Sequence, residues 1–285
     1  MKSEEALALL LGRLFFDDLT KVRIYHLIKN GLDWYEFLNI CIRKKLICMV
    51  YKSLSDLGLI QLLPMIVINN MQYHYDRNQK QNEIFLEASE ALIACFKQKN
   101  ILAVPIKGLR FLTTIYSKSP AVRILNDIDF IASASNQYQI NDLMLNSGYK
   151  PYLINDRDAL CYSDSNRISS FYIKFEPSDP YGKLRIDFDY GCSDKWISDI
   201  VEEKSPIYEF LYLCCLYYEK MHNTSQIDDI SSYNYIKLID LHEYYYAYLL
   251  SFSSENILAY ADAMNIHQQT VFTLNCLKRI YPDMR

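Results

Sequence analysis

The sequence predicts an α+β protein, with a small mixed β-sheet in the middle of the chain and helical segments on both sides. Apolar residues recur at helical spacing before residue 100 and again from Glu202 onward. Between these segments, short runs of apolar and β-branched residues alternate with turn signals. The 285 residues exceed one ordinary domain length, and 51% of them are hydrophobic, which is enough for a sizeable core. We expect three subdomains, at residues 1–100, 101–195 and 196–285.

The N-terminal segment carries three predicted helices. The helical period of the first is set by Leu7, Leu10, Leu11, Leu14 and Phe15. Asp33 precedes Trp34 and has the side chain of an N-cap, so a second helix is expected to begin there. A third helix is predicted from about Met65, just after Pro64, to about Lys99.

The period changes after residue 100. Residues 101–106 form a short apolar run that predicts the first strand, and Lys107-Gly108 ends it. Residues 109–116 return to helical spacing. A second strand is predicted over 123–132, where Ile and Phe alternate with Asp.

The rest of the predicted sheet region contains one helix and two strands. The helix covers 138–145, and Gly148 stands where a C′ glycine is expected. The strands cover 170–175 and 183–189, joined by the turn-rich residues 177–182. The C-terminal helical pattern covers residues 208–219, 235–250 and 255–281.

Composition excludes several function classes. The net charge of −4 and pI of about 5.8 disfavour a broad nucleic-acid-binding face, although they allow a local basic pocket for a nucleotide's phosphates. No Gly-rich dinucleotide or P-loop motif is present.

The eight cysteines include no CxxC pair and are interpreted as buried, reduced thiols rather than zinc ligands. With no signal peptide and no long apolar run, we expect a cytoplasmic protein without a membrane partner.

The strongest candidate site lies in the second predicted strand. Asp127 and Asp129 are two residues apart, so a strand directs both to one face, with Ile128 and Phe130 on the other. Two adjacent carboxylates repel each other unless a cation lies between them, and oxygen ligands of this kind suit Mg²⁺. The alternative interpretation is a solvated strand face with no ligand.

A second acidic strand follows at Leu184-Arg185-Ile186-Asp187-Phe188-Asp189. Asp187 and Asp189 share a face, so a third carboxylate next to the first pair would complete a site for two divalent metals. Such sites stabilise the attacking and leaving oxygens of an in-line displacement at phosphorus. Lys107 could add a point charge, and Gly108 could let backbone N–H groups approach a phosphate, although Lys107 could equally be an ordinary exposed lysine.

The order of these motifs resembles the nucleotidyltransferase superfamily of DNA polymerase beta. More closely, the chain is similar to the uncharacterised bacterial "nucleotidyltransferase family protein" subgroup with Lys-Gly and DxD motifs. The motifs are Ile106-Lys107-Gly108-Leu109, Arg123 with Asp127-Ile128-Asp129, and Ile186-Asp187-Phe188. The helical flanks match with lower specificity, so the similarity covers most of the chain and implies a nucleotidyltransferase core between helical subdomains.

Two departures from the family pattern are visible. Leu109 follows Gly108, where the broader superfamily has serine. Asp189 stands where the subgroup usually has histidine, which leaves the third ligand open between Asp187 and Asp189. The resemblance favours Asp187.

The resemblance implies a Mg²⁺-dependent enzyme that transfers a nucleoside monophosphate from a nucleoside triphosphate to an acceptor and releases pyrophosphate. The implied catalytic residues and ligands of two Mg²⁺ ions are Asp127, Asp129 and Asp187. Lys107 and Gly108 would hold the triphosphate, and Arg123 would neutralise phosphate charge or pair with a core aspartate. The acceptor, a small molecule, peptide or protein, cannot be read from the sequence. The alternatives are a catalytically weak nucleotide-binding or scaffold protein of a biosynthetic cluster, and a toxin-like modifier of tRNA or protein.

Overall fold

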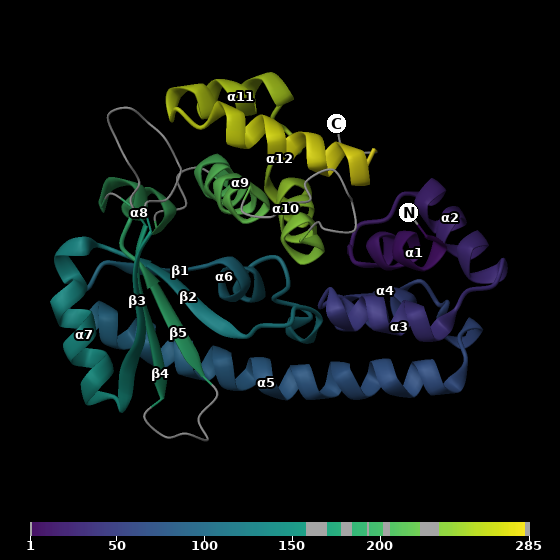
Figure 1. The fold of residues 1–285 in the computed structure, drawn as a ribbon, viewed down its shortest axis with the longest axis horizontal. Coiled ribbons are helices and arrows are strands. Elements are labelled where there is room, and N and C mark those ends of the chain that lie inside the picture. Colours follow the sequence, from purple (N-terminus) through teal and green to yellow (C-terminus); the bar gives the residue numbers. More distant parts are fainter. Residues whose placement is uncertain are drawn as a thin grey trace.

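The computed structural model describes residues 2–157, 170–177, 184–192, 194–201, 206–222 and 234–282. Figure 1 shows a mixed sheet with helices below it, beside it and above it. The predicted α+β class, with a small mixed sheet between helical segments, is confirmed.

The N-terminal segment is helical as predicted. Its helices are α1 (Ser3–Leu11), α2 (Asp18–Lys29), α3 (Trp34–Arg43), α4 (Ile47–Asp56) and α5 (Met65–Gln98). Two of these helices, α2 and α4, are beyond the three predicted, and the first helix ends at Leu11, before Leu14 and Phe15. The carboxylate of Asp33 accepts hydrogen bonds from the backbone N–H groups of Tyr35 and Glu36 and caps α3 as expected. The 34-residue α5 follows Pro64, which lacks the N–H that a helix interior would need.

The central segment forms a five-stranded sheet in the order β1-β2-β5-β4-β3. Its strands are β1 (Ala103–Ile106), β2 (Asp127–Ala132), β3 (Tyr149–Arg157), β4 (Ser170–Pro177) and β5 (Arg185–Asp189). The β2–β5 pair is parallel and the other three pairs are antiparallel. The helices α6 (Lys107–Thr113) and α7 (Gln137–Asn146) lie in this segment, and Gly148 has the expected left-handed φ of 80° after α7.

Strand β3 is absent from the prediction. Lys150-Pro151 and Asn155-Asp156-Arg157 leave no regular alternation of apolar and polar residues. Pairing with β4 on one side only makes β3 an edge strand, where proline is tolerated. Most of the predicted turn at 177–182 lies outside the described residues.

The C-terminal segment is helical. Its helices are α8 (Asp194–Val201), α9 (Pro206–His222), α10 (Tyr235–Tyr248), α11 (Ser254–Ala263) and α12 (His267–Ile280). The single helical segment predicted over 255–281 is therefore two helices. Asn265 adopts a left-handed φ of 56° between them, and the N–H of Ile266 bonds to the carbonyl of Ala261. A hydrophobic period does not reveal such a break, because Asn enters the left-handed region without being a strong breaker.

One face of the sheet packs on α5, which runs beneath both the sheet and the N-terminal helices (Figure 1). The ring of Phe96 on α5 lies 5.4 Å from that of Phe130 and 6.0 Å from that of Phe188. Ile128 and Ile186 are fully buried on the same face. The predicted alternation is thus confirmed, and the aspartates of β2 and β5 are directed to the opposite face.

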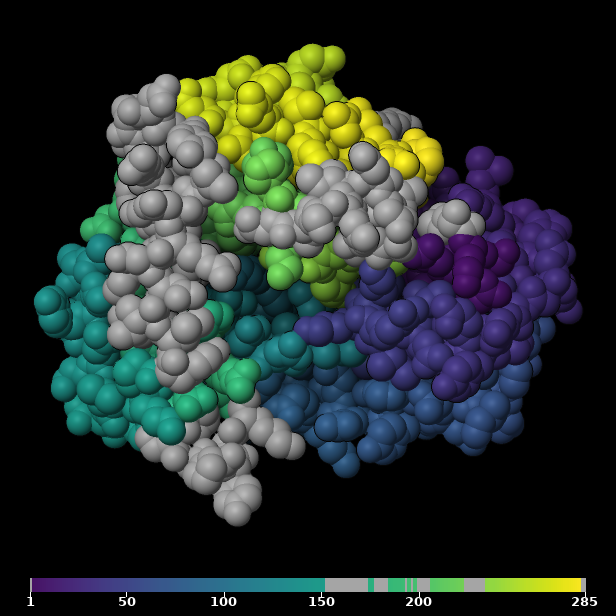
Figure 2. Space-filling view, in the orientation of Figure 1, coloured from purple at the N-terminus to yellow at the C-terminus, as the bar shows by residue number. Residues whose placement is uncertain are grey.

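The C-terminal helices lie against that opposite face. Val104 and Ile131 of the sheet pack with Ile197 of α8 and Tyr212 of α9 in a small buried cluster. A larger cluster joins buried side chains from all three predicted subdomains, among them Leu54, Phe130 and Leu241. The division at residues 100 and 195 stays a prediction, and the three segments share one core. Figure 2 shows the purple N-terminal segment on the right, the teal core segment on the left and the yellow C-terminal helices at the top.

Two expectations drawn from composition concern membrane spans and cysteines. In the part of the chain that the structure describes, no helix is long and apolar enough to cross a membrane. The seven described cysteines are free thiols, six of them buried, as expected of packing residues. Cys161 lies outside the described residues.

Candidate active site

A row of charged side chains crosses four elements on the face of the sheet opposite α5. Asp129 of β2 and Asp187 of β5 are directly paired in register, and Lys174 of β4 pairs with Asp187 from the other side. Ile106, the last residue of β1, pairs with Asp129, and Lys107 follows it. The order across the sheet is therefore lysine, aspartate, aspartate, lysine.

The two lysines neutralise the two aspartates. Lys107 Nζ donates a hydrogen bond to Asp129 Oδ1 at 2.6 Å, and Lys174 Nζ donates one to Asp187 Oδ2. Burial disfavours the charge of Lys107, but Asp129 outweighs this effect and holds the pKa of Lys107 above its usual value. Burial raises the pKa of Asp187, partly offset by the hydrogen bond from Lys174. The pair Asp129–Asp187 is thus held together by a cation on each side.

Asp127 lies on the same face, two residues before Asp129. Within the described residues it makes no ion pair. Burial raises the pKa of Asp127, and the negative charges of Asp129 and Asp187 raise it further. A half-buried carboxylate next to two others is a place where an added cation would be stabilised.

The choice between Asp187 and Asp189 as third ligand can be addressed from their contacts. Asp189 accepts hydrogen bonds from the N–H of Gly191 at 2.8 Å and from the hydroxyl of Tyr212 at 3.0 Å. Asp189 is paired with Ile131, not with Asp129. Oδ1 of Asp187, in contrast, is buried with no hydrogen-bond partner among the described residues. Asp187 is therefore the better-placed ligand, and Asp189 has structural contacts of its own.

Gly108 is explained by packing. A Cβ atom at Gly108 would lie 2.3 Å from Cδ2 of Leu125, so a larger residue at this position would force the Leu125 side chain to move. The left-handed backbone of this turn is at Lys107, with a φ of 53°, and not at the glycine. The expected contact of Gly108 with a phosphate stays a prediction.

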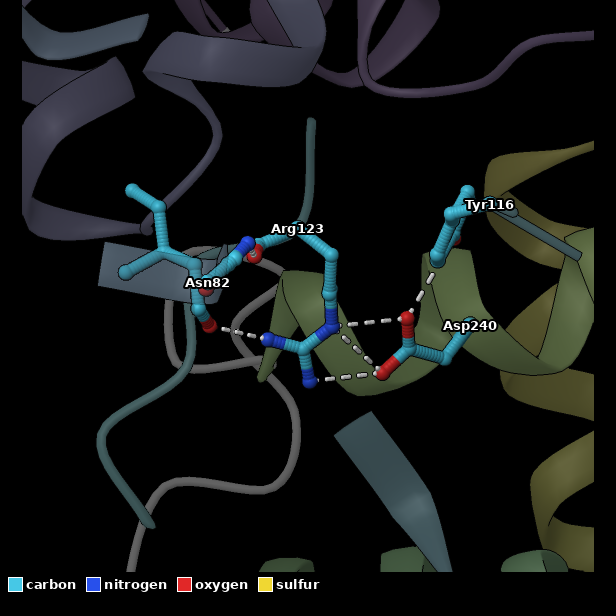
Figure 3. A network of polar contacts seen from close by, with 5 residues as sticks. Asn82, Tyr116, Arg123 and Asp240 are labelled. Atoms are coloured by element: carbon cyan, nitrogen blue, oxygen red, sulfur yellow. Dashed lines mark hydrogen bonds and ion pairs between the residues drawn. The ribbon is translucent and has the colours of Figure 1, made fainter. Parts of the chain in front are cut away.

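Arg123 forms the centre of a buried network (Figure 3). Its Nε lies 3.0 and 3.1 Å from the two carboxylate oxygens of Asp240 on α10, and its Nη2 lies 2.8 Å from Oδ2. Its Nη1 donates to the carbonyl of Ile124, and the hydroxyl of Tyr116 donates to Asp240. Of the two roles expected for Arg123, the structure shows pairing with a core aspartate.

Asn78 and Asn82 on α5 are positioning residues that the sequence analysis did not identify. Asn82 Nδ2 donates to the carbonyls of Pro120 and Arg123, and Asn78 Nδ2 donates to those of Ala121 and Arg123. The two amides are four residues apart and so lie on one face of the helix. They hold the segment 120–123, which leads directly into β2. The sequence does carry one signal for this role, namely two asparagines four residues apart among the periodic apolar residues of α5.

Two further lysines of the site also went unidentified. Lys174 and Phe175 are neighbours on β4, so their side chains point to opposite faces of the sheet. Which face Lys174 occupies follows only from the register of β4 with β5. Lys237 lies half-buried on α10, and burial together with the nearby charge of Lys107 lowers the pKa of Lys237 to about 8. No local pattern marks a lysine on a distant helix as a neighbour of the site.

The residues fit a divalent cation in their chemistry. Among the described residues, no three His, Cys, Asp or Glu side chains are arranged to hold a metal, and the carboxylates of Asp129 and Asp187 are paired with lysines. The donor atoms are all carboxylate oxygens, as Mg²⁺ prefers. Oδ1 of Asp187 has no hydrogen-bond partner among the described residues, so this oxygen is available to a ligand.

The fold and the charged row together define the class of protein. A mixed sheet with acidic residues in register on β2 and β5, next to a Lys-Gly turn after β1, is the arrangement expected of a nucleotidyltransferase. The profile of the uncharacterised nucleotidyltransferase family matches residues 30–282, so the chain belongs to that family. No curated protein and no solved structure shows significant similarity to the chain.

Proposed function

We propose that the protein is a Mg²⁺-dependent nucleotidyltransferase that moves a nucleoside monophosphate from a nucleoside triphosphate to an acceptor and releases pyrophosphate. The observation that carries the proposal is the in-register pair Asp129–Asp187 with Asp127 beside it on one sheet face. Three carboxylates held this close cost electrostatic free energy, which a bound cation would recover. The acceptor is a small molecule, peptide or protein rather than a nucleic acid.

Asp127, Asp129 and Asp187 would hold the metal, in the two-ion form that nucleotidyl transfer uses. Bound Mg²⁺ would neutralise the phosphates and lower the pKa of the attacking acceptor group. Asp187, whose pKa burial raises, is suited to accept the acceptor's proton. Lys174 orients the carboxylate of Asp187.

Lys107 and Lys237 would hold the triphosphate. Lys107 neutralises Asp129 in the structure, and its ammonium becomes available to phosphate oxygens once Asp129 ligates a cation. Lys237 is close enough for the charge of Lys107 to lower its pKa, and an anion between two such lysines relieves their repulsion. Catalysis would then rest on positioning and charge stabilisation.

The test is pyrophosphate release with Mg²⁺ and each of the four nucleoside triphosphates, with mass spectrometry of candidate acceptors. Asp127→Asn, Asp129→Asn and Asp187→Asn are each expected to lower turnover by roughly 10²-fold or more, since each removes a ligand charge. Asp189→Asn is expected to retain more activity than Asp187→Asn. Product carrying one added nucleotide supports transfer.

The matched control is Asp56→Asn, which alters an exposed ion pair with Lys52 and should leave turnover unchanged. Unchanged turnover in both Asp127→Asn and Asp129→Asn would contradict the proposal. An acceptor that gains one phosphoryl group instead of a nucleotide would indicate kinase chemistry.

A second candidate is a nucleotide-binding protein with little turnover. The pairing of Lys107 with Asp129 and of Lys174 with Asp187 favours it, because both cations compete with a metal for carboxylate oxygens. Calorimetry with Mg²⁺ and each nucleoside triphosphate separates the two functions. Tight binding without product across a broad acceptor panel would support this second candidate.

A further inference from the structure

Arg185 belongs to the charged face of the sheet, and the proposed function gives it no role. Its register partner on the parallel strand β2 is Asp127, so the backbones of these two residues lie on neighbouring strands about 5 Å apart. Asp187 follows two residues later on β5, and strand alternation directs both side chains to the same face. Arg185 is exposed, whereas Asp187 is buried. Arg185 is therefore a cation next to the carboxylates of the site, and a solute can reach it.

Lys174 of β4 is a second cation on this side of the site. It pairs in register with Asp187, donates a hydrogen bond to that carboxylate, and has a side chain that is 29% exposed. In the order of the sheet, β5 and β4 lie on one side of β2, and β1 lies on the other. The strand β2 therefore separates Arg185 and Lys174 from Lys107, which follows β1.

The acidic residues near Arg185 that are not proposed metal ligands have partners of their own. Glu176 of β4, one position beyond the last register pair of β4 with β5, lies 3.4 Å from Nζ of Lys150. Asp189 accepts two hydrogen bonds, one from a backbone N–H and one from a tyrosine hydroxyl. Once divalent cations neutralise the other carboxylates, the charge that surrounds Arg185 favours an anion.

In-line displacement assigns the two sides of β2 to different substrates. The acceptor's nucleophilic atom bonds to the α-phosphorus, the bond from that phosphorus to the pyrophosphate oxygen breaks, and the acceptor's proton passes to Asp187. The attacking and leaving atoms lie on opposite sides of the phosphorus. Lys107 would hold the leaving pyrophosphate on the β1 side. The acceptor then enters from the β5 and β4 side, where Arg185 and Lys174 lie.

We propose that Arg185, supported by Lys174, binds an oxyanion of the acceptor, so that the acceptor carries a carboxylate or phosphate group beside its nucleophilic hydroxyl or amine. The inference rests on the proposed function and names the class of acceptor. A guanidinium binds carboxylate and phosphate oxygens through two parallel hydrogen bonds, which fixes the orientation of the bound group. The nucleophile of such an acceptor is thereby aimed at the α-phosphorus.

The test separates the acceptor's anion from the phosphates of the donor. The protein is saturated with Mg²⁺ and the α,β-methylene analogue of a nucleoside triphosphate, which cannot release pyrophosphate, and is then titrated with inorganic phosphate or acetate in a calorimeter. Wild type is expected to bind at least one of these anions, and Arg185→Met should weaken that binding about tenfold. Arg185→Lys keeps the charge but not the paired geometry, so it should weaken binding about threefold.

Three further measurements make the test specific. Both Arg185 variants should keep wild-type affinity for the Mg²⁺-bound nucleotide analogue, because the donor's phosphates lie on the other side of β2. Arg185 is exposed, so both variants should unfold within about 2 °C of wild type. The matched control is Arg77→Met, which removes an exposed arginine of α5, the helix on the other face of the sheet. This control should leave both affinities unchanged.

Three results would overturn the role of Arg185. They are equal anion binding by wild type and Arg185→Met, no anion binding by the wild-type nucleotide complex, and loss of affinity for the nucleotide analogue in Arg185→Met, which would assign Arg185 to the donor. If wild type binds none of the four nucleotide analogues with Mg²⁺, the proposed function itself fails, and the role of Arg185 fails with it.

Discussion

Single residues of the site differ in how their charge is compensated. Asp129 and Asp187 each receive a lysine, whereas Asp127 makes no ion pair among the described residues. The charge of Asp127, which burial and two neighbouring aspartates disfavour, therefore destabilises the metal-free fold. Such a conflict between stability and function is common at active sites.

Asp127→Asn is expected to stabilise the metal-free protein by about 1 kcal/mol at pH 7. Burial and the two neighbouring aspartates raise the folded-state pKa of Asp127, so the stability that its protonated form contributes is present at acid pH. That contribution is lost as the pH rises through the raised pKa. Urea unfolding of wild type and variant should therefore differ at pH 7 and converge below about pH 4. A variant less stable than wild type at pH 7 would contradict this account.

The second residue-scale prediction concerns Lys237. Its pKa is lowered to about 8, so its charged form costs folding stability below pH 8, and the cost disappears as the pH rises toward 10.5. Bound triphosphate needs the charged form, so affinity for Mg²⁺-ATP should fall as the pH rises from 7 to 9. Calorimetry from pH 7 to 9 should show this step in affinity for wild type and for the control Lys52→Met. The step should be absent for Lys237→Met. Retention of the step in Lys237→Met would assign it to another group.

At the scale of elements, the segment 120–123 is held from two sides before β2 begins. Asn78 and Asn82 on α5 bind its carbonyls, and Asp240 on α10 binds the side chain of Arg123. These contacts join the helix under the sheet to a helix above it (Figure 3). The position of Asp127 and Asp129 thus depends on elements far from them in the sequence.

Asp240→Asn is expected to destabilise the protein by about 3–5 kcal/mol, because it leaves the guanidinium of Arg123 buried and uncompensated. Urea unfolding followed by far-UV circular dichroism measures the loss. Replacing both partners, Arg123→Met with Asp240→Leu, should recover part of it. Glu36→Ala, which breaks an exposed pair with Arg43, is the control and should cost less than about 1 kcal/mol. A cost of Asp240→Asn no greater than that of Glu36→Ala would show that the network is not stabilising.

At the scale of the whole molecule, one buried core joins the helices of both ends to the sheet. The face of the sheet opposite α5 receives a lysine from α10, and α5 of the N-terminal segment holds the residues that lead into β2. The position of the charged row therefore depends on how all three segments of the chain pack.

The sequence by itself determined the features that depend on local chemistry. Pro64 and the hydrophobic period predict both ends of α5 to within one residue. Asp33 caps α3 as predicted, and strand alternation separates Asp127 and Asp129 from Ile128. These predictions succeed because a helix cap or a strand face is decided by neighbours a few residues away. The site aspartates were found for the same reason.

Only the tertiary structure decided which distant groups meet the aspartates. Arg123 finds Asp240 across 117 residues, and Lys174 meets Asp187 through a strand register that no local pattern specifies. Lys237 lies close enough to Lys107 to feel its charge, although the two lysines are on α10 and at the start of α6. Electrostatic neighbours act through space, so their identity is known only when the chain has folded.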